Sequence, residues 1–238
     1  MANTTAPSRL LRRFLATLKK RGLRRTLLGA LSYGADYWFD LKHGTDTIAA
    51  VKLDDLGVDD AQKAHAQEYQ STHARPLKNL LMALSIPPGK VLLDLGCGKG
   101  KVLLLAAEFG FKEARGVDFS PALCKIAGQN CAAYKARTKT QTAFAIYAAD
   151  VLAYQMRDDE DVFFLFNPFD AYILKQVLLN ILASRQQRRR KIWIIYRRAV
   201  HRKIIEETIP QATVSDFTFW GFDFVVFEVE SDAEPDHH

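Results

Sequence analysis

Hydrophobic positions follow two patterns along residues 86–230. Short apolar runs, which are typical of buried strands, alternate with longer segments whose apolar residues recur every three or four positions, as on one face of a helix. This alternation predicts an α/β protein with a mostly parallel sheet that helices cover on both faces. The predicted strands are 91–94, 114–118, 143–150, 162–166 and 191–196, and the predicted helices are 101–109, 121–134, 171–184 and 200–209.

The pattern changes after Pro210. Residues 213–220 and 222–230 are rich in β-branched and aromatic residues and are separated only by Gly221. Such runs favour strands, and a break this short predicts an antiparallel pair at the end of the chain.

The turn after the first predicted strand is the most informative segment. Val91–Gly100 reads Val-Leu-Leu-Asp-Leu-Gly-Cys-Gly-Lys-Gly, so three glycines at alternate positions follow an apolar run at once. Glycine is needed where the backbone takes positive φ or lets a ligand approach closely. A strand, turn and helix of this kind bind nucleotide-like cofactors in doubly wound folds. A dinucleotide-binding turn would need its third glycine at position 101, which is Lys101 here.

The pattern Asp-x-Gly-x-Gly-x-Gly at this turn resembles the first motif of class I methyltransferases that depend on S-adenosylmethionine (SAM). The resemblance covers about residues 65–230 and extends, more loosely, to the protein-lysine methyltransferases. It implies a doubly wound, seven-stranded, mostly parallel Rossmann-like sheet, closed by the antiparallel pair at the end of the chain. It also implies SAM as cofactor, bound at this turn by Asp94, Gly96, Cys97, Gly98 and Gly100.

Further matches to this family follow in chain order. Asp118 ends the second predicted strand, where the family has an acid that bonds both ribose hydroxyls, and a carboxylate suits such a vicinal diol. Phe119 is placed to lie against the adenine. Asp150 and Val151, after the third strand, match the acid that contacts the adenine and its neighbour. Ser120, followed by a proline, is the expected N-cap of the helix 121–134.

The resemblance also suggests residues for the methionine end of SAM and for the acceptor. Tyr69 and Thr72 lie in a stretch similar to the start of the helix that covers the methionine end. Asn167, Pro168 and Phe169 resemble a shortened Asn/Asp-Pro-Pro-Tyr/Phe motif, in which an amide and a prolyl carbonyl accept hydrogen bonds from the target nitrogen. They are the candidate catalytic residues, and Asn167 is also a candidate cofactor contact. The missing second proline disfavours a nucleobase, so the preferred acceptor is a protein lysine or another amine.

Basic residues are concentrated at the start of the chain. The 238 residues carry a net charge of +6, but residues 1–35 contain eight Lys or Arg and no acid, which leaves −2 for the remainder. Within this segment, Leu10, Leu11, Phe14, Leu15 and Leu18 share one helical face. Three interpretations remain open: the helix binds an anionic membrane surface, it follows a nucleic-acid backbone, or it docks on the catalytic domain.

We predict three segments: a basic helical extension over 1–58, a SAM-dependent methyltransferase domain over 59–230, and an acidic tail over 231–238. Three cysteines do not indicate a disulfide framework, and the cysteine and histidine spacing does not predict a metal site. Since no run reaches the roughly 18–20 apolar residues that span a bilayer, we expect a cytoplasmic protein. Peripheral attachment through the N-terminal helix is the membrane alternative.

The predicted function is methyl transfer from SAM to an unknown acceptor, for which an RNA and a non-catalytic SAM-binding membrane module are the alternatives to an amine. The RNA alternative requires the N-terminal segment and a second basic cluster, Arg185 with Arg188–Lys191, to form one positive face. That cluster precedes a strand, whereas ligands bind beyond the carboxyl ends of parallel strands. We therefore expect it to be a solvated loop away from the chemistry, and Arg197, Arg198 and Arg202 to be better placed to meet an acidic substrate.

Overall fold

A computed structural model describes residues 23–49, 70–167 and 169–231. Its centre is one seven-stranded sheet in the order β3-β2-β1-β4-β5-β7-β6. The first five strands are parallel, and β7 pairs antiparallel with both β5 and β6, which confirms the predicted fold class. The strands are β1 (Val91–Leu95), β2 (Glu113–Asp118), β3 (Ala143–Ala148), β4 (Val162–Leu165), β5 (Ile192–Arg197), β6 (Thr213–Phe219) and β7 (Phe222–Val229).

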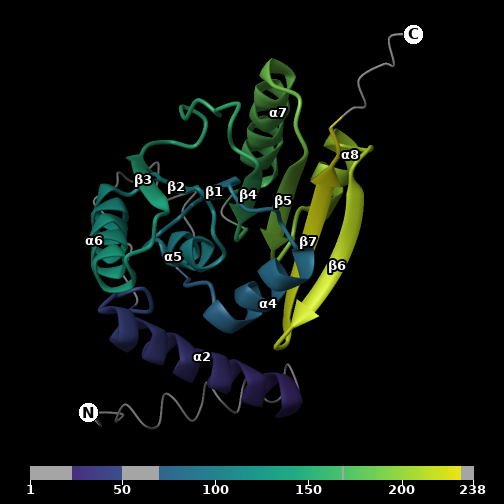
Figure 1. Cartoon of the computed structure of the whole chain (residues 1–238). Helices are drawn as coiled ribbons and strands as arrows, with labels where there is room; N and C mark the ends of the chain where they lie inside the picture. Colours follow the sequence, from purple (N-terminus) through teal and green to yellow (C-terminus); the bar gives the residue numbers. More distant parts are fainter. Residues whose placement is uncertain (1–22, 50–69, 168, 232–238) are drawn as a thin grey trace, which may run out of the picture.

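Helices cover both faces of this sheet (Figure 1). One face packs against α2, α4, α5 and α6, and the other against α7 and α8. Because successive side chains of a strand point to opposite faces, Leu92 and Phe164 belong to the first core and Leu93 and Phe163 to the second. The helices are α2 (Leu23–His43), α4 (Ala74–Leu84), α5 (Lys101–Glu108), α6 (Pro121–Thr138), α7 (Ala171–Gln187) and α8 (Arg202–Thr208).

Two helices on opposite faces begin at side-chain caps. Ser120 Oγ accepts a hydrogen bond from the Leu123 amide at 3.3 Å, and a proline follows at the first helical position, as predicted for α6. Asp170 Oδ1 caps α7 by accepting from the Ile173 amide at 2.9 Å. A cap satisfies an amide that has no partner within the helix. These caps fix the direction in which each helix leaves the carboxyl edge of the sheet.

The N-terminal helix α2 lies across the end of the first layer and contacts α4 and α6. The uncharged stretch 26–35 is therefore part of a helix on the domain surface. The predicted apolar face over Leu10–Leu18 lies outside the described residues. Among the helices that the structure describes, none has the length and apolarity to cross a bilayer.

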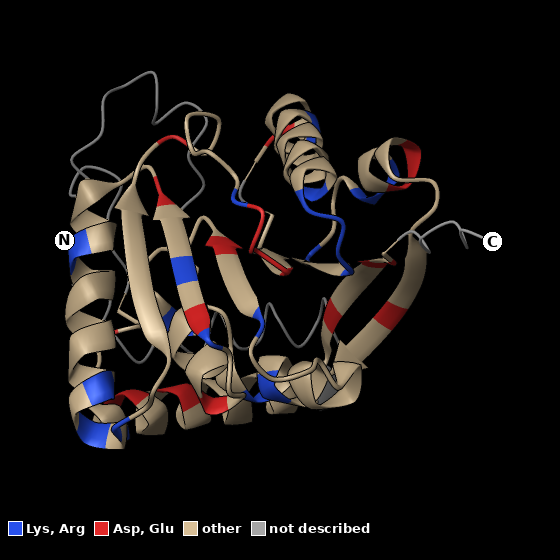
Figure 2. Ribbon diagram, turned by 45° about the horizontal axis from the view of Figure 1, so that its top comes forward, with Lys and Arg blue, Asp and Glu red and all other residues tan. Residues whose placement is uncertain are grey.

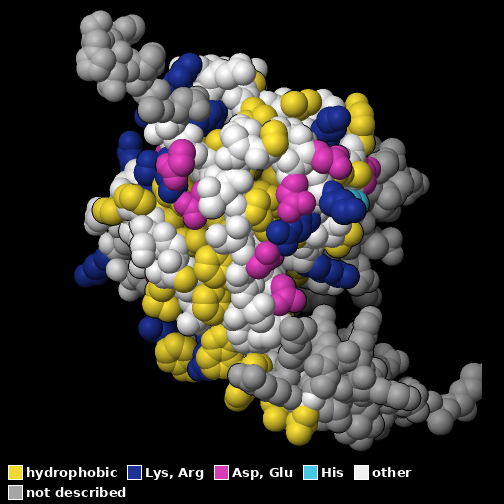
Figure 3. Space-filling model, turned by 90° about the vertical axis from the view of Figure 1, so that its right-hand side faces the viewer, with side chains coloured by type: hydrophobic (Ala, Val, Ile, Leu, Met, Phe, Trp, Pro, Cys, Tyr) yellow, Lys and Arg dark blue, Asp and Glu magenta, His cyan; other side chains and the backbone are white. Residues whose placement is uncertain are grey.

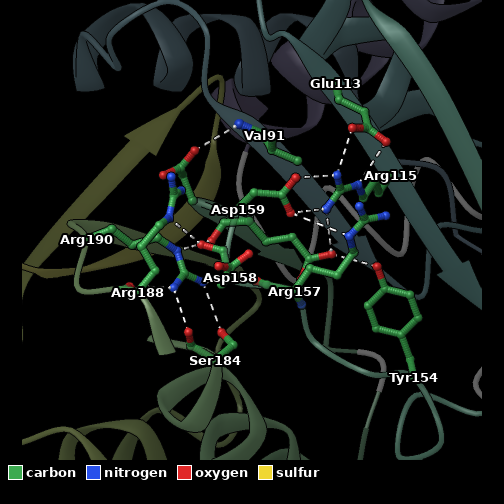
Figure 4. Close-up of polar contacts among 12 residues, drawn as sticks. Val91, Glu113, Arg115, Tyr154, Arg157, Asp158, Asp159, Ser184, Arg188 and Arg190 are labelled. Carbon is green, nitrogen blue, oxygen red and sulfur yellow. Dashed lines mark hydrogen bonds and ion pairs between the residues drawn. The ribbon is translucent and has the colours of Figure 1, made fainter. Parts of the chain in front are cut away.

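No helix lies between β3 and β4 in the described chain; a loop over 149–161 connects them and is held by a buried arginine (Figure 4). The Arg115 side chain, 1% exposed, bonds Glu113 at 2.8 and 2.9 Å, Asp159 at 2.6 and 2.7 Å, and Glu160 at 3.2 Å. Tyr154 donates to Glu160 at 2.6 Å. Hydrogen bonds from Arg115 lower the pKa of Asp159 to about 2. Ionic contacts with Arg115 of β2 therefore help to hold the loop in position.

The basic cluster before β5 is only partly a solvated loop. Arg188 and Arg189 are exposed, but Arg190 is buried and donates to the carbonyls of Glu160 at 2.8 Å and Ser184 at 3.0 Å (Figure 4). Lys191 pairs with Glu228 at 2.8 Å and Glu230 at 2.6 Å. The expectation of a wholly solvated cluster was wrong for Arg190, because backbone carbonyls at the amino end of the sheet need donors.

Arg115→Met should lower the free energy of unfolding by about 3–5 kcal/mol, because it leaves Glu160 buried without its countercharge. The measurement is equilibrium urea unfolding. Arg157→Met is the matched control: its ion pair with Asp159 is longer, 3.6 Å, and half-exposed, so a loss below about 1 kcal/mol is expected. Equal losses in both variants would show that burial of the Arg115 cluster does not matter.

Candidate functional site

The carboxyl ends of the parallel strands meet at one edge of the sheet, where the predicted site residues converge. Figure 2 shows neighbouring arrowheads pointing to the same side, with acids (red) at the ends of two strands. These acids are Asp94 in β1 and Asp118 at the end of β2, which pair in parallel. Ligands of open α/β sheets bind beyond this edge.

The glycine turn joins β1 to α5 in a conformation that only glycine adopts without strain. Gly96, Gly98 and Gly100 have φ values of 88°, 52° and 81°, in the left-handed region. A Cβ on Gly100 would also lie 3.2 Å from the Cβ of Ala127 on α6. The amides of Gly96 and Cys97 both donate to the Val117 carbonyl, at 2.8 and 3.0 Å, so the turn is anchored to β2. The backbone is therefore the surface that a ligand meets here.

Asp118 organises the centre of this edge. Its two carboxylate oxygens accept from the backbone amides of Gly98 at 2.8 Å and Ser120 at 2.9 Å. Burial raises the pKa of Asp118, and these two hydrogen bonds oppose the rise. A carboxylate has about four acceptor positions, so two remain after these bonds. These free acceptor positions fit the two hydroxyl donors of a vicinal diol, such as the ribose of the cofactor that the family resemblance implies.

Asp94 is buried in β1, the strand next to β2, and its charge interacts with that of Asp118. Burial, followed by the negative charge of Asp118, raises the pKa of Asp94 well above its ordinary value. Two buried acids close together favour the binding of a cation beside them, because a nearby positive charge stabilises both carboxylates. A sulfonium-bearing cofactor meets this electrostatic requirement.

Four of the other predicted cofactor residues follow strand ends at this edge: Cys97, Phe119, Asp150 and Val151. Phe119 is half-buried directly after β2. Asp150 is exposed and accepts from the Leu152 amide at 2.8 Å, while Val151 is buried. Thr72 is buried just before α4. Cys97 is buried within the turn as a free thiol, and Tyr69 lies outside the described residues.

Asn167, beyond β4, has a strained backbone and a fixed side chain. Its φ of 43° is uncommon for a residue other than glycine, and such strain is frequent at functional sites. Its Oδ1 accepts a hydrogen bond from the Tyr196 hydroxyl at 2.9 Å, and the residue as a whole is 6% exposed. Burial raises the pKa of Tyr196, so this hydroxyl stays protonated and donates. Phe169 is half-buried nearby in sequence, and Pro168 lies outside the described residues.

The sequence predictions did not include Tyr196. Tyr196 in β5 pairs with Leu165 in β4, and Leu165 lies two residues before Asn167 in the chain. The register between these strands was the signal that could have located Tyr196. Arg197 follows it and is buried, with its guanidinium 3.9 Å from the ring centre of Phe166 and 5.1 Å from that of Phe222. Arg202 instead pairs with Glu206 and Asp216, both at 2.7 Å.

The N-terminal segment is attached to the glycine turn through Lys101, the first residue of α5. Its ammonium group, 2% exposed, donates to Thr47 Oγ1 at 2.8 Å and lies 3.5 Å from Asp40 and 3.8 Å from Asp36. It also lies 4.1 Å from the ring centre of Phe39. Burial lowers the pKa of Lys101, and the two aspartates oppose this.

A second attachment involves Lys99, inside the turn. Its ammonium group is buried and pairs with Asp46 at 2.9 Å. Asn130 of α6 donates to the carbonyls of Lys99 at 2.9 Å and Asp46 at 3.0 Å, and accepts from the Asp46 amide at 2.8 Å. Residues 36–47 therefore hold the turn in place, which the sequence patterns did not predict.

Comparison with known families identifies one match, a methyltransferase domain family whose model covers residues 66–227. No curated protein sequence matches the chain. Among solved structures, magnesium protoporphyrin IX methyltransferase from Synechocystis PCC 6803 is 16% identical, with a TM-score of 0.48 over 65% of this chain and 76% of that one.

Two other solved structures are similar to the same extent. The RNA methyltransferase from Salinibacter ruber in complex with S-adenosyl-L-homocysteine is 16% identical, with a TM-score of 0.48 over 67% of this chain and 94% of that one. The ribosomal protein L11 methylase from Lactobacillus delbrueckii subsp. bulgaricus is 15% identical, with a TM-score of 0.48 over 65% and 77%.

Lys101→Met should lower the free energy of unfolding by at least about 3 kcal/mol, because Asp36 and Asp40 lose the ammonium group that balances their charge. Chemical denaturation followed by circular dichroism measures the loss. Lys125→Met on α6 removes an exposed ammonium and should change stability by no more than about 0.5 kcal/mol. A Lys101→Met protein as stable as wild type would contradict the structural importance of this cluster.

Proposed function

Since the chain belongs to the methyltransferase domain family and is a SAM-dependent methyltransferase, we propose that it methylates a nitrogen atom of an amine, with a protein lysine as the preferred example. The observation that carries this proposal is the fixed amide of Asn167 at the carboxyl edge, next to the strand ends that carry the cofactor residues. The alternative of a SAM-binding module without catalysis does not agree with membership of an enzyme family.

The cofactor is assigned to the edge between β1, β2 and β3. Asp118 has the free acceptor positions for the ribose, and Phe119, Asp150 and Val151 are the proposed adenine contacts. The glycine turn would provide backbone close to the methionine part, and Asp94 a nearby negative charge. When bound, SAM supplies a methyl group on a positively charged sulfur, which is already a strong methyl donor.

The work left to the protein is to orient the acceptor and exclude water. An amine must be deprotonated, with its lone pair directed at the methyl carbon while the sulfur takes the electrons of the breaking bond. In our proposal Asn167 Oδ1 accepts an N–H of the acceptor with the lone pair that Tyr196 leaves free. Tyr196 keeps that oxygen from turning away. Because the nitrogen becomes positive as it is methylated, a carbonyl oxygen at this point stabilises the transition state.

An RNA acceptor is the second candidate that the sequence left open. An RNA acceptor would need exposed Lys and Arg side chains at Arg185–Lys191 that form one positive surface with the basic N-terminal segment. In the structure, Arg190 is buried on backbone carbonyls and Lys191 is neutralised by two glutamates. These contacts favour the amine over the RNA proposal.

Asp118→Ala should weaken SAM binding by roughly ten- to a hundredfold, since a hydrogen bond to a charged group contributes about 1.5–3 kcal/mol. Isothermal titration calorimetry with SAM and with S-adenosylhomocysteine measures the change. Glu207→Ala, an exposed acid on α8, is the control and should bind as wild type. Unchanged affinity in Asp118→Ala would remove Asp118 from the cofactor site.

Asn167→Ala should reduce kcat by roughly 10²-fold or more with little change in SAM affinity, because its contact is made in the transition state. The acceptor is first found by incubating fractionated lysate with tritiated SAM and asking whether label enters protein, RNA, lipid or small molecules. Asn180→Ala on α7 is the control variant. Label in RNA alone would overturn the amine proposal, and normal turnover by Asn167→Ala would reduce Asn167 to a structural turn residue.

A further inference from the structure

Helix α2 has the reverse of the usual surface polarity. Its polar side chains Ser32, Asp36, Asp40 and His43 are buried against the protein. Its outward side is apolar, with residues recurring every three or four positions along one face. The large side chains on that side are 48–68% exposed and are Leu23, Leu27, Leu31, Tyr33, Tyr37, Trp38 and Leu41.

This concentration is unusual for the surface of a monomeric domain. Seven of the twelve large hydrophobic side chains exposed in the described residues belong to this one helix. In Figure 3 hydrophobic side chains (yellow) gather at the lower end of the molecule, where Figure 1 places α2. Large contiguous apolar patches mark sites that bind a protein or a membrane. The outward face of α2, defined by those seven residues, thus has the composition of a binding surface.

Basic side chains border this face. A hollow of about 430 Å³ between α2 and α4 is lined by Leu31 and Trp38 on one side and by Arg75 and Lys78 on the other. Lys42 lies 5.1 Å above the ring of Trp38. The acids of α2 point inward; Glu108, which pairs with Lys78 at 2.5 Å, is the nearby acid on α5. The border therefore has positive charge in excess.

The sequence before α2 adds charge of the same sign, with six Lys or Arg and no acid in residues 1–22. Lipid phosphates attract such bases by about 1 kcal/mol each near an anionic surface. A second copy bound through the same face would instead bring two such basic segments together, which repel each other. Tyrosine and tryptophan rings suit the boundary between lipid headgroups and acyl chains, where one end of the ring is apolar and the other wet.

We propose that the outward face of α2 binds the surface of an anionic membrane, with the helix lying in the plane of the headgroups and its leucines and Trp38 inserted. Helices with one apolar face and basic flanks bind in this way, and their affinity grows with the buried apolar area and with the anionic lipid content. The proposal is independent of the acceptor, because it rests on the outward side chains of α2 and on none of the residues proposed to bind the cofactor or the acceptor.

Co-sedimentation of the full-length chain with vesicles tests this proposal. One set is made of phosphatidylcholine alone and the other of phosphatidylcholine mixed with phosphatidylglycerol. Wild type should sediment with the anionic vesicles at least tenfold more than with the neutral ones, and less as salt is raised. Leu31→Ser/Leu41→Ser should reduce partitioning into anionic vesicles by roughly tenfold or more, since two inserted side chains are lost.

Tyr172→Ser/Leu179→Ser removes two exposed apolar side chains of α7 and should partition as wild type. Both double variants change exposed positions, and thermal unfolding together with SAM titration checks that each is folded. Wild type that binds neither vesicle, or a Leu31→Ser/Leu41→Ser variant that partitions as wild type, overturns the proposal. So does a homodimer in light scattering that dissociates in that variant, because a second copy would then occupy the face.

Discussion

Two buried ammonium groups connect the N-terminal segment to the glycine turn, and the geometry of the turn depends on them. Removing a charge from water costs several kcal/mol per ion, so Lys99 and Lys101 are tolerated only because carboxylates and polar groups meet them. Asp36 has the central position: it accepts the Ala74 amide at 2.7 Å, pairs with His73 at 2.5 Å and faces Lys101. One carboxylate thus sets α2 against the starts of α4 and α5. The turn between β1 and α5 cannot move without breaking these contacts.

Buried ionic contacts also hold a segment on the other face of the sheet. The loop 149–161 takes the place of a helix, and its side chains Val151, Tyr154 and Met156 are buried in the second core. Arg115 adds ionic contacts to that packing, with Glu160 as the deeply buried partner. Burial raises the pKa of Glu160 while Arg115 and Tyr154 lower it again, so the loop is held by a balance between desolvation and pairing.

The parts of the fold that could be predicted from the sequence are those fixed by local pattern. Strands β1, β4 and β5 are mostly apolar, the glycine spacing defines one turn, and α6 begins at Pro121 after Ser120, as predicted. Helix ends were less accurate: α6 continues to Thr138 and α7 to Gln187, because exposed polar ends carry no periodic signal.

What could not be predicted depends on partners distant in the chain. A lysine or arginine is read as exposed unless a countercharge is known, and Arg115 meets Asp159 across 44 residues, as Lys101 meets Asp40 across 61. The Tyr196–Asn167 bond likewise depends on which strands become neighbours. The acids proposed for the site could be located together from the sequence because each lies at or near a strand end, and parallel strand ends meet at one edge.

The contacts of Lys101 also bear on how this chain can change over evolutionary time. A substitution that removes the Lys101 ammonium group leaves two buried carboxylates without their countercharge. A substitution that removes Asp36 leaves Lys101, the His73 ring and the Ala74 amide without that partner. Neither change is tolerated alone at low cost, whereas loss of all the charged groups together is. We therefore expect positions 36, 40 and 101 to change together. A relative without the N-terminal helix would need an uncharged residue in place of Lys101 at the start of α5.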